Sequence, residues 1–128
     1  MGKMYAALIV LVAAGLIGCS QSDKSFEHAI DEKLNDIVHP KDMKVSLSSN
    51  PYDYIKGEDS NKDYKYIVEQ GEKSLNYMLG EFADGNNDGL REYIMAMACA
   101  EILQEDPASK DWSSGRGWYN HYKSAENP

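Results

Sequence analysis

The feature that most constrains the fold is an unbroken apolar stretch from Tyr93 to Ala100. A helix that is apolar on every side is buried on most of its circumference. The alanines at 96, 98 and 100 would let neighbouring backbones approach closely. The sequence therefore predicts a helix over residues 88–104 at the centre of a small all-α domain, with about four helices in total.

Three further segments have helical spacing of apolar residues. Residues 25–38 place Phe26, Ile30, Leu34, Ile37 and Val38 three and four apart, and Pro40 prevents continuation. A second apolar stripe runs from Tyr64 to Phe82 and is interrupted by Gly71. Because glycine disfavours helix interiors and favours helix ends, the stripe predicts two helices, over residues 60–70 and 73–83.

The remaining segments carry weaker patterns. Residues 41–57 read as loop and turn, although the alternation of Val45 and Leu47 leaves a short strand open. At the C-terminus, Trp118 and Tyr122 lie one helical turn apart and are expected to pack back onto the core.

The N-terminus has the pattern of a signal peptide. Lys3 precedes an apolar stretch from Tyr5 to Ile17, which Ser20 and the polar residues after it bring to a stop. A membrane-spanning helix would need ~20 apolar residues. Cleavage after residue 18 is therefore favoured over the alternative, an uncleaved anchor helix.

The end of this stretch, Leu16-Ile17-Gly18-Cys19, resembles the lipobox of bacterial lipoproteins. The resemblance implies cleavage before Cys19 and attachment of a diacylglyceryl group to its sulfur, with acyl chains as the membrane contact. It predicts a lipid-anchored protein on the extracytoplasmic face of the cell membrane. Residues 1–18 would be the signal peptide, 19–24 a tether, and 25–128 the helical extracytoplasmic domain.

A second resemblance concerns the helical domain. Tyr66-Ile-Val-Glu-Gln-Gly71, Leu75-x-x-Met78-Leu79 and Leu90-Arg91-Glu92-x-x-x-Ala96-x-Ala98 together resemble one HEAT-like helical repeat. The run from Asn50-Pro51 to Trp118-Tyr119 is similar to a domain of uncharacterised lipoproteins from Gram-positive bacteria. These are packing motifs, so the resemblance implies a fold and a location but transfers no catalytic residue.

Charge and cysteine content limit the partners and the chemistry that this chain can have. The net charge is −8, and it becomes −9 once Lys3 leaves with the signal peptide. Such a surface argues against nucleic acid as a partner. With Cys19 lipidated, Cys99 has no intramolecular partner, and its apolar setting predicts a buried, unreactive thiol.

The strongest candidate for chemistry is Asp84-x-Asn86-x-Asp88-Gly89, which matches the opening of a calcium-binding loop. The closing position, which should be a bidentate Glu, is Met95. A turn in which Asp88 caps the following helix is therefore favoured over a calcium site. The three histidines, His28, His39 and His121, lack the spacing of a zinc site and are expected at the surface. No cofactor is predicted.

These patterns favour a non-catalytic binding or accessory protein with a protein partner. Two alternatives remain open: an enzyme that acts on the cell wall, and a ligand sensor or immunity lipoprotein. A deep pocket with pKa-shifted carboxylates would favour the enzyme, whereas an exposed apolar groove would favour partner binding.

Overall fold

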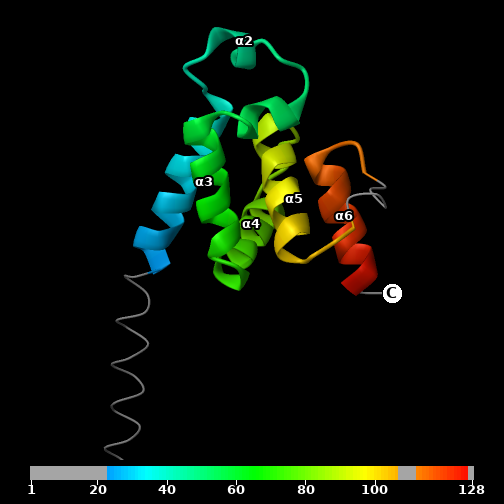
Figure 1. The fold of residues 1–128 in the computed structure, drawn as a ribbon. Coiled ribbons are helices and arrows are strands. Elements are labelled where there is room, and N and C mark those ends of the chain that lie inside the picture. Colours follow the sequence, from blue (N-terminus) through cyan, green and yellow to red (C-terminus); the bar gives the residue numbers. More distant parts are fainter. Residues whose placement is uncertain (1–22, 107–111, 127–128) are drawn as a thin grey trace, which may run out of the picture. The chain divides into compact units, whose positions relative to one another are not determined.

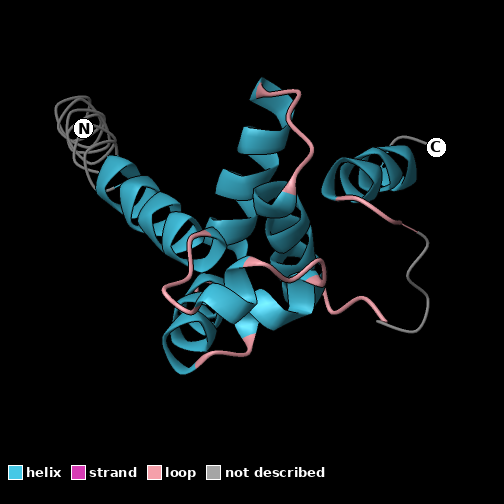
Figure 2. Cartoon of the chain, turned by 90° about the horizontal axis from the view of Figure 1, so that it is seen from above, coloured by secondary structure: helices cyan, strands magenta, loops and turns pink. Residues whose placement is uncertain are grey.

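The computed structural model describes residues 23–106 and 112–126. The chain divides into two compact units, residues 1–30 and 31–128, and a helix over residues 23–38 runs from the first into the second. The described residues contain helices, turns and loops but no strand (Figure 2). The predicted all-α class is confirmed.

In the described part of the chain, six elements follow that first helix (Figure 1). They are α2 (Met43–Ser46), the 3-10 helix η1 (Pro51–Ile55), α3 (Glu58–Glu69), α4 (Glu72–Asp84), α5 (Leu90–Ile102) and α6 (Gly115–Glu126). The alternative of a short strand around Val45 and Leu47 is wrong, because Val45 lies in the short helix α2 and Leu47 directly follows it. Asp42 starts that helix by accepting a 2.9 Å hydrogen bond from the backbone N–H of Lys44.

Helix α5 is the centre of the second unit. It contacts α3, α4, α6 and η1, and every residue from Ile94 to Cys99 is buried. Cys99 is a free thiol with no exposed surface, and burial raises its pKa. The predicted central helix and the predicted buried cysteine are both confirmed, since packing on all sides is what an all-apolar helix requires.

Gly71 separates α3 from α4, as its position in the apolar stripe predicts. Its φ of +60° lies in the region that favours glycine. The backbone N–H of Gly71 donates to the carbonyl of Val68, and its own carbonyl accepts from Leu75 in the first turn of α4. One residue therefore ends the first helix and starts the second.

Helix α6 lies unusually close to α5. A Cβ added to Gly115 would come within 2.2 Å of the carbonyl carbon and oxygen of Glu92, so only glycine fits there. Farther along α6, Tyr119 stacks on Phe82 of α4 and Trp118 stacks on Tyr122. Trp118 is buried, which confirms that the aromatic tail packs onto the core.

The proposed lipobox, Leu16, Ile17, Gly18 and Cys19, lies outside the described residues, as do the signal peptide and most of the tether. Within the described part of the chain, no helix has the length and apolar character needed to span a membrane.

Candidate functional site

A groove of about 860 Å³ lies at the C-terminal ends of α5 and α6. The groove is lined by the last turns of α5, the turn over residues 103–106, Trp112 and the second half of α6. Tyr52 of η1 and Tyr64 of α3 complete the lining. We call it the α5–α6 groove. Its volume falls within the range of protein ligand sites, roughly 300–1,000 Å³.

The turn that ends α5 forms one wall of this groove. Glu105 donates its N–H to the carbonyl of Ala100, and Gln104 donates to that of Glu101. This pair of bonds closes a Schellman motif around the C-cap residue Leu103. Gln104 has a φ of +57°, a left-handed conformation that a non-glycine residue adopts at a cost of about 1 kcal/mol. The Schellman motif accounts for this conformation, and Gln104 lines the groove.

Two glutamates of this wall are oriented by aromatic donors. The Tyr64 hydroxyl donates a 2.8 Å hydrogen bond to Glu101 Oε2, and Trp118 Nε1 reaches both carboxylate oxygens of Glu105, at 3.3 and 3.2 Å. Burial, followed by the hydrogen bond to Glu101, raises the pKa of Tyr64. The phenol therefore remains a donor at neutral pH, and it fixes the carboxylate without neutralising it.

The groove combines acidic and aromatic side chains. Its described lining includes four carboxylates (Glu101, Glu105, Asp106 and Glu126) and four aromatic rings (Tyr52, Tyr64, Trp112 and Tyr122) but no lysine or arginine. Among the described residues, Tyr52 and Leu103 are exposed large apolar side chains, at 41% and 38%, although Met43 and Leu47 outside the groove are more exposed. The arrangement offers flat apolar faces beside negative charge.

The turn after α4, the calcium candidate, is occupied by a cation of the chain itself. The Arg116 guanidinium donates to the carbonyls of Phe82, Gly85 and Asn87, at 2.6, 2.9 and 3.1 Å. It also lies over the rings of Phe82 and Tyr119, 5.5 and 5.7 Å from their centroids. Carbonyl oxygens in the turn that could face a metal therefore already bind a positive charge.

The three residues proposed as calcium ligands, Asp84, Asn86 and Asp88, have different positions and contacts in and around this turn. Asp84 is the last residue of α4, Asn86 is exposed in the turn, and Asp88 accepts a 3.1 Å bond from the backbone N–H of Arg116. The expectation that Asp88 caps the next helix is wrong. Helix α5 starts at Leu90 with Gly89 as its N-cap, and Glu92 instead accepts from the Gly89 N–H. Asp88 therefore accepts from a backbone N–H at the start of α6, 28 residues later in the sequence.

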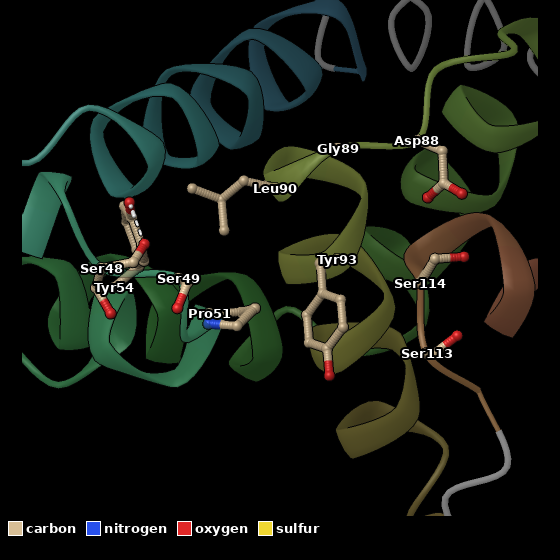
Figure 3. Close-up of a pocket in the computed structure, with 10 residues that line it drawn as sticks. All are labelled: Ser48, Ser49, Pro51, Tyr54, Asp88, Gly89, Leu90, Tyr93, Ser113 and Ser114. Atoms are coloured by element: carbon tan, nitrogen blue, oxygen red, sulfur yellow. Dashed lines mark hydrogen bonds between the residues drawn. The ribbon is translucent and has the colours of Figure 1, made fainter.

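A second hollow, of about 330 Å³, lies beside this turn. Ser48 and Ser49 line it on one side and Asp88 and Ser114 on the other, with Tyr93 of α5 between them (Figure 3). Several of its polar groups are already bonded within the chain: Ser48 donates to Asp53 at 2.6 Å, and Ser114 accepts from the Gly117 N–H.

The carboxyl group that Ser48 contacts beside this hollow is unsuited to acid catalysis at neutral pH. The hydrogen bond from Ser48, followed by that from Lys56, lowers the pKa of Asp53. A general acid at neutral pH needs a raised pKa. The second hollow is also smaller than the α5–α6 groove, and its Ser48 and Ser114 side chains are already bonded within the chain, so it is the weaker candidate site.

All three histidines are exposed, as the sequence predicts. His121 contributes to the α5–α6 groove, and His39 bonds the carbonyl of Asn35. Within residues 23–106 and 112–126, no group of three or more His, Cys, Asp or Glu side chains is arranged to hold a metal ion.

Residues such as His121 and Tyr122, which line this groove, are already notable in the sequence, but the sequence does not predict the groove itself. A signal was present, since Met97, Ala100 and Glu101 are spaced by three and four along α5, which places them on one helical face. The sequence does not predict that this face of α5 lies beside the end of α6, Tyr52 and Tyr64. Comparison with protein-family models, with curated proteins and with solved structures finds no match to this chain.

Proposed function

We propose that this protein is a lipid-anchored accessory protein of the extracytoplasmic membrane face, whose helical domain binds a partner protein in the α5–α6 groove. The observation that carries the proposal is the groove itself, with exposed Tyr52 and Leu103 beside Trp112. Aromatic side chains are enriched where proteins bind one another, because they bury large areas at a small entropic cost.

The anchor and the groove support each other in this proposal. Leu16 to Cys19 has the pattern of a lipid attachment site, and two acyl chains would hold the domain at the membrane surface. A tethered domain meets membrane-bound partners at a raised effective concentration, so a groove of modest affinity suffices.

Site-specific photo-crosslinking in cells that export the protein tests the binding role. A photoreactive residue replaces Leu103 in the groove. The matched control replaces Leu47, which is 80% exposed and does not line the groove. We expect a discrete adduct of higher mass from position 103 and none from position 47. No adduct from position 103, or the same adducts from both positions, would remove the groove as the binding site.

A further inference from the structure

We infer that the occupant of the α5–α6 groove is a basic segment of the partner, with an arginine side chain seated against its aromatic faces and between Glu101 and Glu105. This inference rests on the proposed binding role and adds the chemistry of the partner. It follows from charge, from ring faces and from the way the two glutamates are held.

The charge of the groove points to a cation. Its described lining carries four carboxylates, one histidine (His121) and no lysine or arginine, in a chain whose net charge is −8. Because Glu101 and Glu105 are bonded by the neutral donors Tyr64 and Trp118, their positions are set while their charges remain uncompensated by those donors. A cation entering the groove meets carboxylates that lose little conformational freedom on binding.

The ring faces favour the same kind of ligand. A cation over an aromatic face is attracted by the ring quadrupole. The chain already uses this contact elsewhere: Lys123 Nζ lies 4.7 Å from the centre of the Tyr119 ring, and Lys33 Nζ lies 4.6 Å from that of Tyr66. In the groove, the rings of Tyr52, Trp112 and Tyr122 line the same hollow as the carboxylates, and Tyr122 stacks on Trp118 with one of its faces.

Arginine suits this site better than lysine. Its planar guanidinium can stack on a ring and donate two parallel hydrogen bonds to a carboxylate in the same pose. Arg116 shows this dual use within the chain, since its guanidinium lies over Phe82 and donates to backbone carbonyls at once.

The test uses the full chain in non-ionic detergent and two synthetic peptides. One is acetyl-Gly-Arg-Ala-Arg-Gly-amide, and the other replaces both arginines with citrulline, which keeps the shape and removes the charge. The chain has two tryptophans; Trp112 lines the groove and Trp118 bonds Glu105. Tryptophan fluorescence therefore reports binding directly. We expect saturable binding of the arginine peptide, weakened by added salt, and at least fivefold weaker binding of the citrulline peptide.

Three charge-neutralising variants locate the site. Glu101→Gln and Glu105→Gln retain an oxygen acceptor for Tyr64 and Trp118, so circular dichroism should remain unchanged. Each should weaken the arginine peptide about two- to fivefold, as expected for partly exposed ion pairs. Glu69→Gln removes the same charge from an exposed position of α3 outside the groove and should change affinity little.

Equal binding of the two peptides, binding of neither, or an equal loss in Glu69→Gln and the groove variants would overturn the inference. The proposed binding role fails separately, because it depends on the adduct at position 103. If that adduct persists undiminished in the Glu101→Gln, Glu105→Gln double variant, the groove binds a partner but not through a cation.

Discussion

Arg116 is predicted to be the most important single side chain for holding α6 and the turn after α4 in place. Its guanidinium joins the end of α4 to the turn through three carbonyls and lies over two rings. Arg116→Met removes the charge and every donor while keeping an apolar stem of similar length.

The expected loss is dominated by one of the three bonds. Phe82 is buried, so its carbonyl loses a charged donor, and such a bond contributes about 1.5–3 kcal/mol. The carbonyls of Gly85 and Asn87 lie in a turn that water can reach, so their loss is largely compensated. Stacking on Phe82 and Tyr119 adds about 0.5–1 kcal/mol, part of which methionine retains. We expect the free energy of unfolding to fall by about 2–4 kcal/mol.

Thermal and urea denaturation followed by circular dichroism measure this loss. For a domain of this size the melting temperature should fall by roughly 10–25 °C. Arg116→Lys retains the charge but cannot reach three acceptors with a planar fork, so its loss should be intermediate. If Arg116→Met melts within about 2 °C of the unchanged protein, the guanidinium does not join these elements and the reasoning fails.

Three further predictions concern packing and the calcium candidate. Gly115→Ala should lower the free energy of unfolding by about 1–3 kcal/mol, because its Cβ overlaps the Glu92 backbone. Gly80→Ala has open space around it and should raise the free energy of unfolding by up to about 1 kcal/mol. Similar urea midpoints for the two variants would contradict the close contact at Gly115. Cys99→Asp should lose more than about 3 kcal/mol by burying an unpaired carboxylate, whereas Cys99→Ala should be mild; a wild-type melting curve for Cys99→Asp would mean that position 99 is exposed. Calorimetric titration with calcium should give no micromolar binding, and binding with a clear rise in melting temperature would make the 84–89 turn a calcium site.

Local features of the fold could be predicted from the sequence because local chemistry determines them. Gly71 marks the junction of α3 and α4 since only glycine readily adopts its backbone conformation. The apolar stretch from Tyr93 to Ala100 marks the central helix since it has no face for water. The pair Trp118 and Tyr122 stacks because helical geometry places them together.

Contacts between distant segments could not be predicted in this way. Nothing in the sequence near Asp88 says that its partner is the backbone of Arg116, 28 residues later. The same holds for Glu101 and Tyr64, which meet across 37 residues. Nothing in the sequence marks Gly115 as a point of close contact, and only the packing of α6 on α5 shows why a side chain cannot stand there. The groove belongs to this class of feature.

Cys19 is the residue on which the proposed membrane anchor depends, and the anchor decides where the groove can meet a partner. Mass spectrometry of the N-terminal peptide, prepared from the membrane fraction, tests that anchor. The account predicts a chain that begins at Cys19 and carries diacylglycerol on its sulfur, and it predicts that Cys19→Ala abolishes the modification. A wild-type chain that begins at Met1 or lacks the lipid would contradict it.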